Sequence, residues 1–281
     1  MMIVVIAYLV ASHGREILET VRRMQPIQLV LVTGLALVTL VARTEAVVAC
    51  LSAMKTRPRR VDLHAANSLT FLASTINHYV SSIVRGVLVR RLDPGRSPTI
   101  PQMVVVDTAT GLIEALVVAV LIVASAGTLK LAWWIPLLVL CAGGAALTVA
   151  LVVRRRLAHF PLLRGLDVFG NPRQRIVVAV LMLAVIAAQV VRTLVVLQAA
   201  GLHPSLIQAV ATLVAGGVLS SLFAGPGAGT AAGPLLVFGK HSLAASTAAG
   251  LVLSVTMLIA GLVYAAPGGP TFLVRLRSRR A

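Results

Sequence analysis

Three polar side chains lie on one face of an apolar segment at 101–126. Asp107, Thr110 and Glu114 stand at positions i, i+3 and i+7 of this segment. On a helix this spacing places them in one stripe about 10 Å long. A charged side chain inside a membrane is costly unless it is paired or hydrated, and it commonly marks a pathway or a binding site. The stripe therefore predicts either a structural charge pair or a site for a polar ligand.

A second polar stripe interrupts the apolar segment 176–200 at Gln189, Arg192 and Thr193. Along a helix, Glu114 lies about 20 Å and Arg192 about 24 Å from the start of its own segment. The matching depths predict a Glu114–Arg192 ion pair. An arginine at this depth could also bind an anionic ligand.

Arg85 directly follows a segment at 63–84 that is only moderately apolar. An arginine in this position can hold a phosphate with two parallel hydrogen bonds. An arginine that only extends its head to the level of the lipid headgroups would have the same spacing. The residues that we expect to contact lipid are Arg85, Arg192, Asn77, Ser81 and Ser82.

The sequence carries no motif of an enzyme active site: no metal-ligand spacing, no glycine-rich phosphate loop with its lysine and no nucleophile elbow. We therefore expect no catalytic residue, no metal, no cofactor and no enzymatic activity. Cys50 and Cys141 are expected to be packing residues. Four histidines stand singly near segment ends and are expected at the membrane interface: His13, His64, His159 and His203.

The composition indicates a membrane protein built from helices. Of the 281 residues, 58% are apolar and 12% are charged, and the mean hydropathy is +0.97. These values lie outside the range of soluble domains, and apolar runs near 20 residues without alternation are typical of transmembrane helices. The net charge of +17 comes from basic residues at the ends of apolar runs, without interleaved aromatic residues. This pattern favours anionic lipid over nucleic acid as the partner.

We expect an all-α bundle in one integral membrane domain that covers residues 1–281. The expected spans are 1–12, 27–42 with an amphipathic extension to about 54, 101–126, 131–153, 176–200 and 249–266. Basic residues favour the cytoplasmic side. Because basic runs at 55–60 and 85–96 flank 63–84, that segment is expected to enter and leave the membrane from the cytoplasm. The same rule places the C-terminus in the cytoplasm. Eight ordinary spans are the alternative.

Two prolines and four glycines occupy residues 224–234, inside an apolar run. Proline and glycine disfavour a continuous helix. We therefore expect an open backbone at Pro226, Gly227 and Gly229 that borders a cavity. Segment 205–247 would then be a second re-entrant element, inverted relative to 63–84, as in many transporters. A Gly/Pro loop at the membrane surface is the alternative.

Three stretches resemble motifs of a known family. Asn77 to Arg91 (NHYVSSIVRGVLVRR), followed by Val104 to Asp107 (VVVD), and Pro226 to Gly229 (PGAG) resemble motifs of the lysylphosphatidylglycerol synthase transmembrane region, the flippase-like integral membrane family. The matching residues are Arg85, Asp107, Pro226, Gly227 and Gly229. The chain departs from the family pattern at Asn77, Ser81, Ser82, Thr108 and Gly233.

The resemblance implies a multi-pass protein of the bacterial inner (cytoplasmic) membrane. It implies movement or binding of an anionic or modified lipid, either amino-acylated phospholipid or polyprenyl-linked lipid, between leaflets. A non-transporting membrane subunit that recruits or stabilises an enzyme of envelope-glycolipid synthesis is the alternative. An integral membrane glycosyltransferase is disfavoured, because the chain has only eight acidic residues.

Overall fold

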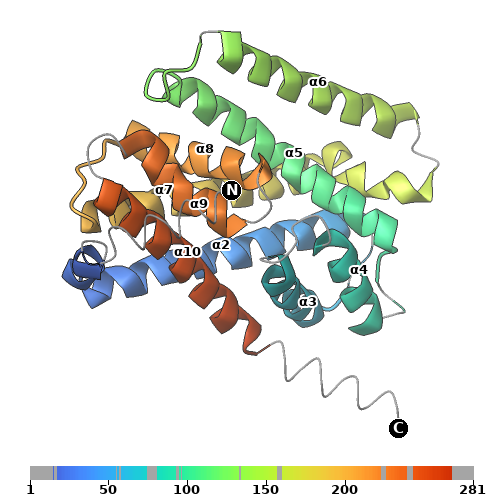
Figure 1. Cartoon of the computed structure of the whole chain (residues 1–281). Coiled ribbons are helices and arrows are strands. Elements are labelled where there is room, and N and C mark those ends of the chain that lie inside the picture. Colours follow the sequence, from blue (N-terminus) through green and yellow to red (C-terminus); the bar gives the residue numbers. More distant parts are fainter. Residues whose placement is uncertain are drawn as a thin grey trace. The chain divides into compact units, whose positions relative to one another are not determined.

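The structure is a computed structural model that describes residues 15, 18–54, 56, 58–74, 81–92, 95, 97–132, 134–156, 160–222, 226–238 and 243–267 (Figure 1). Within these residues it contains helices and no strand, which confirms the all-α prediction. In chain order the helices are α2 (Pro26–Ala53), α3 (Arg60–Ser74), α4 (Ser81–Leu92), α5 (Ile100–Ser125), α6 (Trp134–Arg156), the 3-10 helix η2 (Pro161–Gly170), α7 (Pro172–Ala199), α8 (Leu206–Leu222), α9 (Pro226–Phe238) and α10 (Leu243–Ala265).

Five helices, α2, α5, α6, α7 and α10, are long and apolar enough to cross a membrane. They correspond to the expected spans that begin at 27, 101, 131, 176 and 249, whereas the expected span at 1–12 lies outside the described residues. Their surfaces carry many exposed apolar side chains, such as Leu137, Leu138 and Val149 on α6. Because soluble proteins rarely expose large continuous apolar patches, these helices indicate a multi-pass membrane protein.

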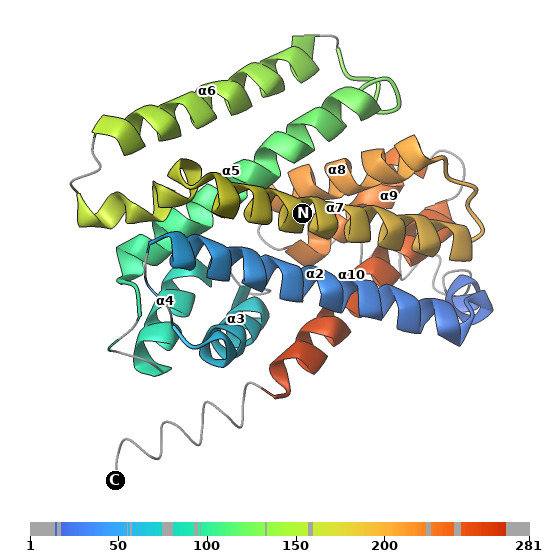
Figure 2. The same cartoon turned by 180° about the vertical axis from the view of Figure 1, so that it is seen from behind.

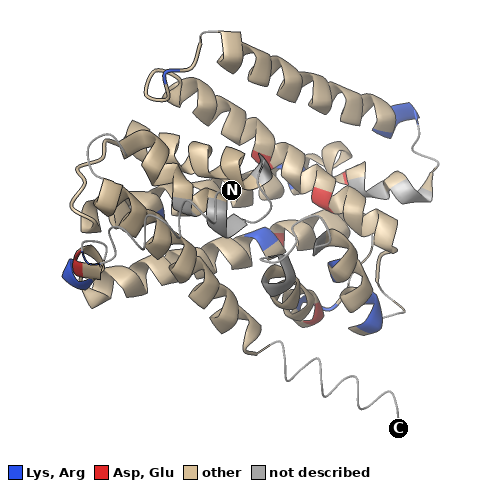
Figure 3. Ribbon diagram, in the orientation of Figure 1, with Lys and Arg blue, Asp and Glu red and all other residues tan. Residues whose placement is uncertain are grey.

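The distribution of charge supports the same conclusion. In Figure 3 most of the described chain is uncharged, and α6 carries its basic residues, Arg154, Arg155 and Arg156, in its last turn. Basic side chains at a helix end can reach the lipid headgroups while the apolar body of the helix stays in hydrocarbon.

The chain forms two compact units. Unit 1 contains residues 1–38, 120–136 and 187–260, and unit 2 contains residues 39–119, 137–186 and 261–281. The boundaries fall within long helices, so each unit is built from parts of these helices together with shorter elements.

In unit 2, α3 and α4 pack against each other, and both views show them side by side (Figures 1 and 2). The core around them includes Leu63 of α3, Val89 of α4, Leu51 of α2 and Met103 of α5. At 15 and 12 residues, these helices are about 22 and 18 Å long, shorter than the hydrocarbon core of about 30 Å. Neither α3 nor α4 is therefore long enough to be an ordinary span by itself, and the two pack against each other. Entry of this helix pair from the cytoplasm stays a prediction.

Unit 2 also contains an ordered element between the spans α6 and α7. Residues Pro161–Gly170 form η2, and its side chains Leu166, Val168 and Phe169 are buried in the core. Burial of these apolar side chains stabilises an ordered element in this connection.

In unit 1, α8 and α9 pack closely (Figures 1 and 2). The predicted open backbone over 224–234 is wrong for most of its length, because α9 begins at Pro226 and contains Gly227, Gly229 and Pro234. The first position of a helix tolerates proline, since the N–H at that position has no partner within the helix. Residues 224 and 225 of the predicted break lie outside the described residues.

Close packing explains the glycines of α9. A Cβ atom at Gly229 would lie 2.6 Å from the carbonyl oxygen of Gly216, and one at Gly233 would lie 2.6 Å from that of Thr212. Small residues four apart allow two membrane helices to approach this closely. The glycines that predicted an open cavity therefore allow close contact between α8 and α9 instead.

Candidate functional site

Unit 2 brings together Arg85 of α4 and Asp107 of α5. Arg85 Nη1 donates a hydrogen bond to Asp107 Oδ1 at 2.5 Å, and the two side chains are 15% and 17% exposed. Arg85 Nε and Asp107 Oδ2 are buried and have no hydrogen-bond partner among the described residues. The positive charge of Arg85 is therefore already neutralised by the carboxylate of Asp107.

Glu114 of α5 forms an ion pair with Arg43 of α2, and the prediction that it pairs with Arg192 is wrong. Matching depth on two helices does not fix which charges meet, since that depends on which helices are neighbours. The sequence feature that could have indicated the partner of Glu114 is Arg43, a basic residue within the apolar segment that forms α2. Thr110, between the two acidic residues, donates to the backbone carbonyl of Asp107 at 3.0 Å.

Arg192 of α7, in unit 1, is buried, and its partners among the described residues carry no charge. It is 6% exposed. Its guanidinium donates to the carbonyl of Leu253 and to Thr256 Oγ1 at 3.1 Å, and it lies 3.7 Å from Met257 Sδ, all on α10. Its Nε has no partner, and within the described chain no carboxylate forms an ion pair with it. These neutral groups orient the arginine but leave its positive charge uncompensated.

A hydrogen-bond network in unit 2 joins α2, α3 and α10. His64 of α3 contacts Tyr264 of α10 through Nδ1 at 2.6 Å and Glu45 of α2 through Nε2 at 3.0 Å. Tyr264 OH lies 2.8 Å from Thr44 Oγ1, which also accepts a hydrogen bond from Asn67. The sequence analysis assigned His64 only to the interface, because contacts with residues 19 and 200 positions away leave no pattern in one sequence.

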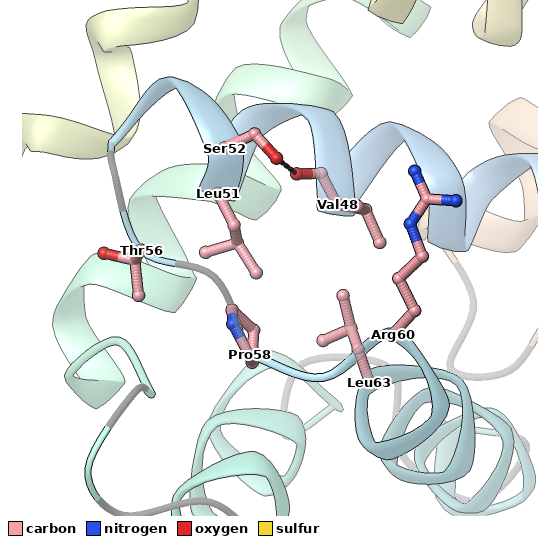
Figure 4. Close-up of a pocket in the computed structure, with 7 residues that line it drawn as sticks. All are labelled: Val48, Leu51, Ser52, Thr56, Pro58, Arg60 and Leu63. Carbon is pink, nitrogen blue, oxygen red and sulfur yellow. Dashed lines mark hydrogen bonds between the residues drawn. The ribbon is translucent and has the colours of Figure 1, made fainter.

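A cavity of about 300 Å³ lies beside this network, at the end of α2 and the start of α3 (Figure 4). Leu51 and Leu63 point into it, and Arg60 extends from α3 toward α2. Arg60 is also 3.9 Å from Glu45 Oε2, and its side chain is 73% exposed. The cavity is lined by Val48, Leu51, Ser52, Thr56, Pro58, Arg60 and Leu63.

The other candidates are dispersed. Asn77 lies outside the described residues, and Ser81 and Ser82 begin α4, where Ser82 is half-buried. Pro226 and Gly227 lie in the first turn of α9. Ser82 thus shares α4 with Arg85, whereas Arg192 belongs to the other unit.

Cys50 is buried, as expected of a packing residue, and Cys141 is exposed, which corrects that expectation for the second cysteine. Within the described residues, no group of three or more His, Cys, Asp or Glu side chains is placed to hold a metal ion.

Compared with known proteins, the chain matches no protein-family model, no curated protein and no solved structure. The resemblance to the flippase-like family therefore remains a prediction that rests on the motifs quoted above.

Proposed function

We propose that this chain is a flippase-like membrane protein that binds an anionic lipid headgroup and moves that lipid between leaflets. The observation that carries the proposal is Arg192, a buried arginine in a candidate span whose described partners are all neutral. An unbalanced charge in a low-dielectric interior is unfavourable, and a charged residue inside a membrane commonly marks a substrate pathway. An anion from outside the chain would supply the missing charge.

A lipid phosphate is the anion that fits this position best. Arginine binds phosphate through parallel hydrogen bonds, and the Nε of Arg192 is a donor without a partner. Lipid phosphate is also the anion most abundant around a chain with a net charge of +17. Amino-acylated phospholipids and polyprenyl-linked lipids carry the same phosphate chemistry.

The Arg85–Asp107 pair takes a second role in this proposal. Both residues match the resembled family, and both keep a buried atom without a hydrogen-bond partner. A lipid phosphate that replaced Asp107 at Arg85 would leave the carboxylate free. We therefore assign Arg192 to the site that holds the lipid at rest and Arg85 to a transient contact during lipid movement. The proposed location is a bacterial inner membrane, with the C-terminus in the cytoplasm.

The test is leaflet-specific labelling in vesicles. The purified full chain is reconstituted with fluorescent phosphatidylglycerol, and a membrane-impermeant quencher reports how much of the probe has left the outer leaflet. We expect faster exchange than in protein-free vesicles and at least a tenfold loss of that gain in Arg192→Met, since a change of about 1.4 kcal/mol corresponds to tenfold. Arg173→Met is the matched control, because Arg173 is an exposed arginine at the start of the same helix.

Two results would contradict the proposal. One is exchange no faster than in protein-free vesicles, which would favour the alternative of a non-transporting subunit. The other is equal exchange in Arg192→Met and the parent chain, which would remove Arg192 from the lipid pathway.

A further inference from the structure

The hydrogen-bond network around His64 can lack one proton donor when all of its side chains are neutral. Thr44 Oγ1 lies 3.0 Å from the carbonyl oxygen of Leu40, within its own helix, and a hydroxyl has only one proton to donate. Asn67 already donates to Thr44 Oγ1. The direction of the remaining bonds therefore depends on where Thr44 sends its proton.

In the first arrangement, Thr44 donates to Leu40. Tyr264 must then donate to Thr44, because their oxygens lie 2.8 Å apart and one proton must separate them. The Tyr264 oxygen is now only an acceptor, so His64 must donate to it from Nδ1 across 2.6 Å. His64 Nε2 faces a carboxylate oxygen of Glu45 at 3.0 Å and must donate as well. An imidazole that donates from both nitrogens is a cation, so this arrangement holds one extra proton.

In the second arrangement, Thr44 donates to Tyr264, Tyr264 donates to His64 Nδ1, and His64 donates from Nε2 to Glu45. Each contact from Thr44 through Tyr264 and His64 to Glu45 again has one donor and one acceptor, Thr44 no longer donates to Leu40, and the imidazole is neutral. The two arrangements differ by one proton on His64 Nδ1 and by rotation of two hydroxyl groups, Tyr264 and Thr44. Neither hydroxyl loses its own proton.

A protonated His64 would form an ion pair with Glu45, whose carboxylate lies 3.0 Å from Nε2. Arg43 is paired with Glu114, and Arg85 is paired with Asp107. Glu45 has no such arginine, because Arg60 lies 3.9 Å away and is largely exposed, where solvent screens the interaction. Arg85 is within electrostatic reach of Tyr264, and it opposes a further positive charge there. Protonated His64 would give Glu45 the close cationic partner that it lacks.

Neither side chain of this pair is fully buried. The side chains of His64 and Glu45 are 25% and 29% exposed. Arg60 both lines the cavity at the α2–α3 corner and approaches Glu45, so the cavity adjoins the site. A proton from bulk water therefore has a short route to the network.

The geometry points to a proton-binding site formed by His64 and Glu45. Binding of a proton there sets the direction of the hydrogen bonds through Tyr264 and Thr44, and these bonds connect α2, α3 and α10. We assign this proton as the coupling ion of lipid movement, and only that assignment rests on the proposed function. Histidine suits the task because its charge changes near neutral pH.

The site is tested on the full chain in detergent with selectively ¹⁵N-labelled histidine, observed by NMR across a pH series. The signal lost in His64→Gln identifies His64, and His203→Gln, which removes an exposed histidine, should leave that signal unchanged. We expect the neutral form to carry its proton on Nε2 and to gain the second proton on Nδ1. At a fixed pH, Glu45→Gln should reduce the doubly protonated fraction, because the imidazolium loses its anionic partner.

Thr44→Val provides a readout that a purely structural histidine would not give. It keeps the shape of the side chain but removes the acceptor for Tyr264 in the protonated arrangement, so it should also reduce the doubly protonated fraction of His64. A neutral form protonated on Nδ1, or a His64 signal that neither Glu45→Gln nor Thr44→Val changes, would overturn the proton site.

The coupling is tested in the lipid vesicles with an imposed pH gradient. We expect the gradient to change lipid exchange by the parent chain and by His203→Gln but not by His64→Gln. An equal response in His64→Gln would overturn the coupling. A positive NMR result without lipid exchange in the parent chain would leave the proton site standing and contradict the proposed function.

Discussion

At the scale of single residues, the arginines Arg43, Arg85 and Arg192 differ in the charge of their partners. Arg43 and Arg85 each have a carboxylate partner, and these partners come from the predicted stripe on α5. Arg192 has only neutral partners among the described residues. The difference matters because a buried ion pair can be purely structural, whereas a buried cation with only neutral partners can bind an anion.

The Arg85–Asp107 pair predicts a specific pattern of stability. Arg85→Leu and Asp107→Leu should each lower the free energy of unfolding by roughly 3–5 kcal/mol, because each leaves one buried charge without its partner. The double variant should lose much less, since removal of both charges avoids that cost. The measurement is unfolding by SDS titration in mixed micelles.

Arg90→Leu is the control for this series, because Arg90 is an exposed arginine on the same helix α4. It should change the free energy of unfolding by about 0.5 kcal/mol or less. Equal stability of Asp107→Leu and the parent chain would show that the pair contributes nothing.

At the scale of elements, the segment around Pro226 shows what composition can and cannot determine. Proline and glycine weaken a helix in isolation, so the sequence predicted an open backbone there. The structure gives α9 a partner, α8, whose backbone approaches Gly229 and Gly233 so closely that larger residues would not fit. Tertiary packing therefore overrides the local preference, and this could not be read from the segment alone.

This contact predicts opposite effects for two glycine substitutions. Gly233→Ala should lower the free energy of unfolding by about 1–3 kcal/mol, because its methyl group would overlap the backbone of α8. Gly217→Ala should be neutral or stabilise by up to about 1 kcal/mol, because nothing lies within 4 Å of the added Cβ atom. Thermal unfolding in detergent measures both. An unchanged midpoint for Gly233→Ala would contradict the close α8–α9 contact.

The long apolar helices were the most predictable elements. Their starts differ from the expected ones by one to six residues, because hydropathy over some twenty residues averages out local errors. The site was less predictable. The stripe with Asp107 and Glu114 left a charge pair and a ligand site open, and the partners that the structure shows, Arg85 and Arg43, depend on helix neighbours that one sequence does not reveal. His64 carried no local signal at all.

At the scale of the whole molecule, composition and structure agree on a multi-pass helical membrane protein. Five helices are long and apolar enough to cross the bilayer, and their exposed surfaces are rich in leucine, valine and isoleucine. The net charge of +17 supports the proposal that an anionic lipid is the partner. The central claim is that Arg192 binds the phosphate of such a lipid.

Lipid-dependent stability of the purified full chain tests this claim most directly. A ligand that binds only the folded state stabilises it by about 2.7 kcal/mol at one hundred times its dissociation constant. Phosphatidylglycerol should therefore raise the thermal midpoint of the parent chain and of Arg173→Met, and phosphatidylcholine should raise it much less. Without lipid, Arg192→Met should be at least as stable as the parent chain, because it removes an unbalanced buried charge. It should also lose the response to phosphatidylglycerol. The same phosphatidylglycerol-dependent rise in Arg192→Met as in the parent chain would contradict the account.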